Sequence, residues 1–146
     1  MKMKVKIKKF NEKAVVPYKH HDDDYCYDVV ATSCEEIAPN VFKYGIGLGF
    51  EIAEPLPLSN VSIDFRPRSS VWRTGLVLSN CEGTIDISYR GEVSAVFYKV
   101  AEGEIYKVGD RIGQIKIGVT MPMEFEVVDE LTETERGVGG YGSTGR

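Results

Sequence analysis

The chain has 146 residues, of which 42% are hydrophobic and 27% are charged, the composition of one globular domain with its own core. Its net charge of −4 and its pI of about 5.3 argue against a protein that coats nucleic acid, so a polyanionic ligand would depend on local donors. No apolar run approaches the length that spans a membrane.

The N-terminal residues predict a β-strand with one solvated face, because Met3, Val5 and Ile7 alternate with lysines. This start is positively charged but lacks the apolar stretch of a secretory signal. The three cysteines show no Cys-x-x-Cys spacing, which argues against a zinc site and favours a reduced, cytoplasmic compartment. We therefore expect a cytoplasmic protein that binds neither membrane nor nucleic acid.

Two interpretations are open for the segment His20–Asp24, which reads His-His-Asp-Asp-Asp. Its side chains are all metal ligands by type, but consecutive residues cannot all face one ion. A solvated loop is the favoured interpretation.

Short runs rich in β-formers follow, separated by Gly, Pro and Asn. This spacing predicts an all-β sandwich or barrel and not alternating βαβ units. One short helical turn is expected at Ser70–Thr74, with Trp72 packed against the core. The predicted strands are Tyr27–Ala31, Val41–Ile52, Val61–Phe65, Gly75–Leu78, Val93–Val100, Asp110–Ile117 and Phe125–Val128.

The segment Asn80–Glu92 predicts a strand or hairpin, because Gly83 and Gly91 bracket seven residues rich in β-formers. Alternation places Asp86 with Thr84 and Ser88 on one face, and Ile85, Ile87 and Tyr89 on the other. Strand interiors are depleted in Asp. Asp86 is therefore either a solvated residue of an edge strand or a carboxylate that activates a water at a pocket wall.

Arg68, Ser69 and Ser70 precede the predicted helical turn. A guanidinium, two hydroxyls and the backbone N–H groups of a helix start can form a phosphate cradle. The alternative is an N-cap serine beside a surface arginine.

The last stretch, residues 132–146, differs from the rest of the chain. It contains five glycines from Gly137 to Gly145, so it cannot bury a core and is expected to be mobile without a ligand. The sequence thus predicts a β-domain over residues 1–131 and a flexible tail over residues 132–146.

Several of these motifs, in this order, resemble those of the trimeric deoxyuridine triphosphatases (dUTPases), from about Asp24 to the C-terminus. The most specific are the hairpin pattern Gly-x-Ile-Asp-x-x-Tyr-Arg-Gly and the tail Arg-Gly-Val-Gly-Gly-Tyr-Gly-Ser-Thr-Gly. Shorter matches are Pro-Arg-Ser, ending at Ser69, and Gly-Asp-Arg-Ile-Gly-Gln, ending at Gln114, where Gly113 replaces the usual Ala. Tyr27-Asp28 resembles the first motif, although Tyr25-Cys26 stand where the family has Ala-Gly.

The resemblance implies a role for each matching residue. Asp86 would orient and deprotonate the attacking water, and Asp28 would support the Mg²⁺-bound triphosphate through water. Arg111 would buttress the site, and Tyr89 would pack beneath the deoxyribose, where a 2′-hydroxyl would clash. Because strict alternation separates Asp86 from Tyr89, this role requires a bend between them. The residues implied to bind substrate are Arg68, Ser69, Ser70, Asn80, Gly83, Thr84, Ile85, Tyr89, Gln114, Arg136, Gly140, Tyr141, Gly142, Ser143 and Thr144.

Within that set, the resemblance divides the contacts by substrate group. Arg68 and the two serines that follow it would grip the α- and β-phosphates, and Gln114 would also reach a phosphate. Asn80 and the hairpin backbone would read the uracil. In the tail, Tyr141 would stack on the uracil, and the Ser-Thr pair would contact the γ-phosphate. Arg136 would help to clamp the closed tail.

The fold that the resemblance implies is a distorted jelly-roll β-barrel with one short helix. The activity is the hydrolysis of dUTP to dUMP and pyrophosphate by a Mg²⁺-dependent homotrimer whose active sites are shared between subunits. Two alternatives remain at this point, a dCTP deaminase of the same fold and a non-catalytic nucleotide sensor or interaction protein.

Overall fold

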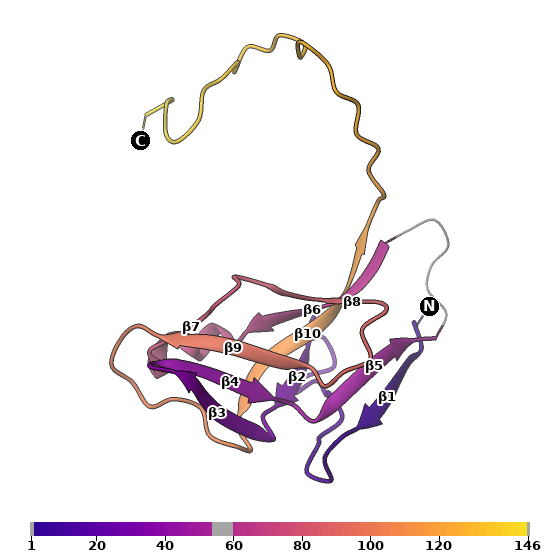
Figure 1. The fold of residues 1–146 in the computed structure, drawn as a ribbon, viewed down its shortest axis with the longest axis vertical. Coiled ribbons are helices and arrows are strands. Elements are labelled where there is room, and N and C mark those ends of the chain that lie inside the picture. The colour runs from indigo at the N-terminus through magenta and orange to yellow at the C-terminus, as the bar shows by residue number, and fades with distance from the viewer. Residues whose placement is uncertain (1, 54–59, 146) are drawn as a thin grey trace.

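The computed structural model describes residues 2–53 and 60–145 of the chain. Over these residues the fold is almost entirely β-structure, with one short 3₁₀ helix, which confirms the predicted all-β class (Figure 1). In chain order the elements are β1 (Val5–Lys9), β2 (Tyr27–Val30), β3 (Ser33–Ala38), β4 (Val41–Gly45), β5 (Leu48–Ile52), β6 (Asn60–Pro67), η1 (Ser69–Thr74), β7 (Leu76–Leu78), β8 (Gly83–Asp86), β9 (Ser94–Lys99) and β10 (Arg111–Thr120).

Two four-stranded sheets and a two-stranded ribbon make up the body of the protein. One sheet has the order β2-β10-β6-β8, the other has the order β3-β4-β9-β7, and the ribbon pairs β1 with β5. All of these pairings are antiparallel, and strands distant in sequence are neighbours, as in a jelly roll. Within the described ranges the sheets remain separate ladders and do not close into one barrel.

The hydrophobic core draws on both sheets. Phe97 of β9 is completely buried, and its ring meets that of Phe65 of β6 with 6.4 Å between the ring centroids. Along β6, Val61, Ile63 and Phe65 are buried because every second residue of a strand points to the same face. The residues between them lie on the opposite face of the sheet: Ser62, Asp64 and Arg66. This polar outer face of the sheet β2-β10-β6-β8 carries much of the candidate site.

Three strand predictions differ from the structure. Ser33–Ala38 forms β3 although all of its residues are exposed, so it has no apolar alternation to reveal it. The predicted strand Val41–Ile52 is two strands, because the chain turns at Gly47, whose φ of 68° suits glycine. The predicted strand Phe125–Val128 is wrong, since this segment is exposed and forms no strand with any residue that the structure describes.

The helical turn is confirmed as the 3₁₀ helix η1, but the predicted packing of Trp72 is wrong. In a 3₁₀ helix, residues three apart share a face. Val71 and Thr74 occupy the inner face, where Val71 packs against the core and Thr74 is buried. Trp72 therefore points outward and is 71% exposed, with the Arg73 guanidinium 5.3 Å from its ring centroid.

The C-terminal segment leaves the body after β10 and extends away from it (Figure 1). Its apolar side chains are exposed, among them Phe125, Leu131 and Tyr141. In the parts of the chain that the structure describes, no helix is both long and apolar enough to cross a bilayer.

Candidate functional site

A groove of about 510 Å³ opens beside the start of β10 and brings together residues from three parts of the sequence. It contains five of the residues singled out above, which come from β2, from the β6–η1 junction and from β10. They are Asp28, Arg68, Ser69, Arg111 and Gln114. Ser70, in contrast, is not among the residues that line the groove.

The sheet register fixes the polar wall of this groove. Gln114 on β10 lies opposite Asp28 on β2 and opposite Arg66 on β6, so the three form one row across the sheet. Arg111 donates a hydrogen bond from Nη1 to Asp28 Oδ2 at 2.8 Å. The Asp28 side chain is only 14% exposed, so this ion pair is sheltered from water and holds the carboxylate in a fixed position.

The groove is rich in positive charge. Arg66, Arg68 and Arg111 all line it, whereas Asp24 and Asp28 are its carboxylates. Arg66 is paired with Glu82 at 2.7 Å and Arg111 with Asp28, but Arg68 makes no ion pair with any described residue. Arg68 is therefore the guanidinium most available to an incoming anion.

Arg66 was not predicted from the sequence as a site residue. Arg66 follows the buried Phe65 on β6 and directly precedes Pro67-Arg68. This position in the sequence was the signal from which Arg66 could have been predicted as a site residue. Its Nε donates to Glu82 Oε1, and this hydrogen bond raises the pKa of the guanidinium. The pair also ties β6 to the chain just before β8.

From the His20–Asp24 segment, His20, His21 and Asp24 line the groove, together with Cys26. The Asp24 carboxylate accepts a hydrogen bond from the His21 backbone N–H at 2.8 Å, and this bond lowers the pKa of Asp24. The rings of His20 and His21 meet edge to face. This internal bonding keeps the segment a compact loop.

Gly113, which stands where the motif matched by Gly-Asp-Arg-Ile-Gly-Gln usually has alanine, has a packing reason. A Cβ atom at this position would overlap the ring of Phe65, which is itself only 3% exposed. The glycine therefore allows β10 to lie close to β6 directly behind Gln114.

Asp86 lies elsewhere on the same sheet face. With Thr84 it lines a second hollow of about 590 Å³, to which Asn60, Ser62 and Gly118 also contribute. Ile85, between them, packs against the core, as the alternation predicts. Asp86 is the last residue of β8 and is exposed.

The groove and Asp86 are separated along the strands of one chain. Asp86 lies opposite Ser62 on β6, whereas Gln114 lies opposite Arg66. These two positions on β6 are four residues apart, which corresponds to about 13 Å at 3.3 Å per residue. A single chain therefore does not place Asp86 against the same phosphorus atom as the groove arginines.

Tyr89 follows a tight turn after β8. Its backbone N–H donates to the Asp86 carbonyl at 3.0 Å, so the chain bends between the two residues as the predicted role of Tyr89 requires. The Tyr89 hydroxyl donates to the Glu92 carbonyl at 3.0 Å. Because a Cβ at Gly91 would overlap the tyrosine ring, only glycine lets the ring lie against this stretch of backbone. Tyr89 is 48% exposed and offers one edge to solvent.

Asn80 lies in the turn between β7 and β8, where its side chain is exposed, and Gly83 opens β8. A Cβ at Gly83 would lie 3.3 Å from Phe65 Cβ, so this position too is closely packed on the β6 side.

The tail residues are brought to neither hollow. Arg136 donates from Nε to the Gly139 carbonyl at 3.0 Å, and Ser143 N–H bonds the Gly140 carbonyl at 3.0 Å, both within the tail itself. Tyr141 adopts a positive φ of 51° and is fully exposed. Gly142 and Thr144 lie in the same series of turns. The predicted site residues of one chain thus fall into three separate places: the groove, the β8 region and the tail.

Comparison with known proteins gives a consistent result. The sequence profile of the dUTPase family matches residues 12–145. The deoxyuridine 5′-triphosphate nucleotidohydrolase of Clostridium novyi is 36% identical over 146 residues, covering 98% of this chain and 99% of the relative. That of Corynebacterium glutamicum is 37% identical over 145 residues, covering 97% and 95%.

Solved structures agree on the fold. The Staphylococcus bacteriophage 80alpha dUTPase with dUPNHPP superposes with a TM-score of 0.80 at 22% identity, covering 98% of this chain and 99% of that one. A mutant of the dUTPase from phage phi11 of S. aureus, described with a structural Mg(II) ion, gives a TM-score of 0.71 at 20% identity, covering 89% and 99%. The architecture is therefore that of dUTPases.

Proposed function

Because the chain belongs to the dUTPase family, we propose that it hydrolyses dUTP to dUMP and pyrophosphate at a site built from the groove, the β8 region and the tail. The observation that carries this proposal is the arginine-rich groove, in which Asp28, Arg68, Ser69, Arg111 and Gln114 converge from three separate motifs. Such a cluster of guanidinium, hydroxyl and amide donors suits a polyphosphate.

The groove residues do the binding. Arg68, which makes no ion pair with a described residue, is proposed to hold phosphate oxygens with its guanidinium, with the Ser69 hydroxyl and the Gln114 amide as additional donors. Arg111 positions the Asp28 carboxylate by direct hydrogen bonding. The net effect is to fix the α-phosphorus and to neutralise charge on the chain of phosphates, which is the main way in which proteins catalyse phosphoryl transfer.

Asp86 is proposed as the general base. Its exposed carboxylate at the end of β8 would orient a water and accept its proton as the water oxygen attacks the α-phosphorus. The bond from that phosphorus to the bridging oxygen then breaks, and pyrophosphate leaves. Tyr89 is proposed to lie beneath the deoxyribose and to exclude a 2′-hydroxyl, because the turn after Asp86 brings the Tyr89 backbone to the Asp86 carbonyl and leaves the ring half exposed.

The residues present fit a Mg²⁺ ion that would be held mainly by the phosphates of the substrate. The described residues contain no group of three or more His, Cys, Asp or Glu side chains placed to hold a metal. Mg²⁺ at nucleotide sites usually keeps several waters and takes one or two carboxylates along with the phosphates. Asp28 would suit this role, since the hydrogen bond from Arg111 engages Oδ2 and holds the carboxylate in place. When bound, Mg²⁺ would supply charge neutralisation on the phosphate oxygens.

A homotrimer with shared sites is part of the proposal. Asp86 is about 13 Å along the strands from the row that contains Gln114, by the strand rise, and the tail contacts neither. A site that draws the three from different subunits of a homotrimer accounts for this separation. This separation supports the expectation that each active site is formed by neighbouring subunits.

The cytoplasm is the proposed compartment. All three cysteines are free thiols, and Cys34 and Cys81 are exposed, which suits a reducing environment.

A product assay tests the proposed function. The purified protein with Mg²⁺ should release pyrophosphate from dUTP and leave UTP, dTTP and dCTP nearly untouched. Release of ammonia from dCTP would instead identify a deaminase. Binding of dUTP with no product at all would identify a non-catalytic nucleotide sensor.

A further inference from the structure

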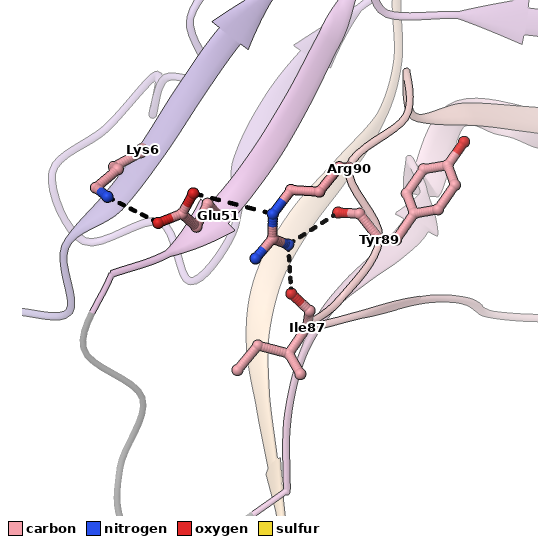
Figure 2. A network of polar contacts seen from close by, with 5 residues as sticks. All are labelled: Lys6, Glu51, Ile87, Tyr89 and Arg90. Carbon is pink, nitrogen blue, oxygen red and sulfur yellow. Dashed lines mark hydrogen bonds and ion pairs between the residues drawn. The ribbon is translucent and has the colours of Figure 1, made fainter.

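The turn that carries Tyr89 is linked to the N-terminal ribbon by a network of charged side chains. Figure 2 shows Arg90 reaching from this turn toward Glu51 on β5, with Lys6 of β1 on the far side of the Glu51 carboxylate. Glu51 Oε1 accepts from Lys6 Nζ at 2.7 Å, and Glu51 Oε2 lies 3.9 Å from Arg90 Nε. The carboxylate therefore lies between two cations.

The Arg90 guanidinium also holds the turn itself. Its Nη1 donates to the Ile87 carbonyl at 2.6 Å and to the Tyr89 carbonyl at 3.3 Å (Figure 2). These two carbonyls belong to the segment between Asp86 and Tyr89. The Arg90 guanidinium thus holds one backbone carbonyl before and one after the Cα atom of Tyr89, from which the Tyr89 ring projects.

The two legs of the turn are held differently. The second leg is bonded to the start of β5 and to the residue before it, from Val93 N–H to the Leu48 carbonyl at 2.8 Å and from Gly47 N–H to Glu92 Oε1 at 2.8 Å. Among the described residues, the first leg, 87–90, has one backbone bond, from Tyr89 N–H to the Asp86 carbonyl. Its side-chain bonds are the one from the Tyr89 hydroxyl to the Glu92 carbonyl and those from Arg90 to the Ile87 and Tyr89 carbonyls. The Arg90 guanidinium therefore shares in holding this leg, and Glu51 is the anion beside that guanidinium.

The ribbon lies close enough for this linkage to be direct. A Cβ on Gly49, two residues before Glu51, would lie 3.1 Å from the Gly91 carbonyl oxygen and 3.3 Å from that of Arg90. Lys6 lies directly opposite Glu51 in the β1–β5 register, which places its ammonium beside the carboxylate. The hydrogen bond from Lys6 lowers the pKa of Glu51, with a smaller contribution from Arg90, so the group is an anion at neutral pH.

We propose that Glu51 is a positioning residue: through Arg90 it sets the conformation of residues 87–90 and thereby the place of Tyr89 beside the substrate sugar. This inference rests on the proposed role of Tyr89 in excluding a 2′-hydroxyl. Glu51 itself touches no substrate. Removing the Glu51 carboxylate should therefore reduce the discrimination between deoxyribose and ribose substrates.

The test compares Glu51→Gln with Glu35→Gln, the same change at an exposed glutamate of β3 that makes no ion pair with any described residue. The ratio of kcat/KM for dUTP over UTP should fall about two- to fivefold in Glu51→Gln, the scale of an exposed ion pair. It should stay at the wild-type value in Glu35→Gln. Arg90→Lys replaces the planar guanidinium by a single ammonium group and should also lower the ratio of kcat/KM for dUTP over UTP.

Two further readouts separate positioning from general stability. Hydrogen exchange of the Tyr89 amide should be faster in Glu51→Gln at an unchanged melting temperature. Adding Glu51→Gln to Arg90→Lys should lower the ratio less than the product of the two single effects, because both act through one contact.

An unchanged ratio together with unchanged exchange in Glu51→Gln would overturn the inference. So would a lower melting temperature with an unchanged ratio, which would limit Glu51 to stabilising the ribbon. If the wild-type protein does not hydrolyse dUTP, the proposed function fails, and faster exchange in Glu51→Gln would still support the link from Glu51 to the turn.

Discussion

The hydroxyl groups of Tyr44 and Tyr106 lie in one aromatic cluster of the core but have different surroundings. The two rings meet edge to face with 6.1 Å between centroids. The Tyr44 hydroxyl donates to the Tyr106 carbonyl at 2.9 Å. The Tyr106 hydroxyl is buried without a hydrogen-bond partner among the described residues. Burial raises the pKa of both phenols, so both stay neutral at physiological pH.

The two tyrosines therefore predict opposite outcomes for the same substitution. Tyr44→Phe should lower the free energy of unfolding by about 1–3 kcal/mol, because it leaves a buried carbonyl unpaired. Tyr106→Phe should be neutral within about 0.5 kcal/mol or stabilising, because it removes a hydroxyl that has no partner. Urea denaturation at one fixed protein concentration measures both. Equal losses in the two variants would contradict this prediction.

Asp86 gives a second prediction at the scale of one residue. Asp86→Asn keeps the size of the side chain but removes the proton acceptor, so kcat for dUTP should fall by about a hundredfold or more. The variant should remain folded and should still bind a non-hydrolysable dUTP analogue. Asp129→Asn, at an exposed position in the extended segment, is the control and should keep full activity. Near-normal turnover by purified Asp86→Asn would remove Asp86 from the mechanism.

At the scale of elements, the outer face of the sheet β2-β10-β6-β8 contains an ion pair of Lys116 with Asp64. This pair lies along the strands between the groove and Asp86. Lys116 Nζ donates to Asp64 Oδ2 at 2.7 Å, and the Ser62 hydroxyl donates to Asp64 Oδ1 at 2.7 Å. Only 12% of the Asp64 side chain is exposed. Gly118 on β10 makes room for the carboxylate, because a Cβ there would overlap Asp64 Oδ2.

This ion pair predicts a pH-dependent contribution to stability. Burial acts to raise the pKa of Asp64, but the hydrogen bonds from Lys116 and Ser62 outweigh it and hold the pKa below the ordinary value of 3.8. A lowered carboxyl pKa stabilises the fold above the unfolded-state value, and this contribution is lost as the pH falls through the folded-state value.

The difference in unfolding free energy between wild type and Asp64→Asn should therefore be largest above about pH 5 and should shrink below about pH 4. Urea unfolding across this range is the measurement, with Asp129→Asn as an exposed control that should show no such trend. A difference that grows on acidification would contradict the sign.

At the scale of the whole molecule, the groove, the β8 region and the tail lie apart within one chain, and the proposed homotrimer would bring them together from different chains. Asp86→Asn and a deletion of residues 137–146 should each be inactive alone. If Asp86 and the tail of one site come from different chains, unfolding and refolding the two variants together in equal amounts should restore about a quarter of wild-type activity, from independent assortment of chains.

Mass measurement of the refolded sample would verify that mixed trimers have formed. If mixed trimers form and no activity returns, both elements come from one chain and the shared site is excluded.

The sequence alone determined the features that depend on residues close together in the chain. Runs of β-forming residues bounded by Gly, Pro and Asn are local signals, so β6, β9 and β10 could be predicted from them. The short helix after Arg68 and the glycine-rich tail likewise depend on nearby residues. The order of the motifs was also enough to indicate the family that the comparisons show.

The tertiary structure decided what depends on neighbours. The strand β3 exists because β4 pairs with it, whereas Phe125–Val128 has no such partner within residues 2–53 and 60–145. Trp72 is exposed because a 3₁₀ turn gives the inner face to Val71 and Thr74. Backbone partners and burial come from segments that are distant in sequence, so a local sequence pattern does not reveal them.

The same reason explains the candidate site. The motifs named Asp28, Arg68 and Gln114, but only the register of β2, β10 and β6 placed them in one groove with Arg66. The register also set Asp86 apart from that groove on the same sheet face. Which strands become neighbours, and in which register, is decided by packing the whole core, because a shift of one residue would turn every apolar side chain outward.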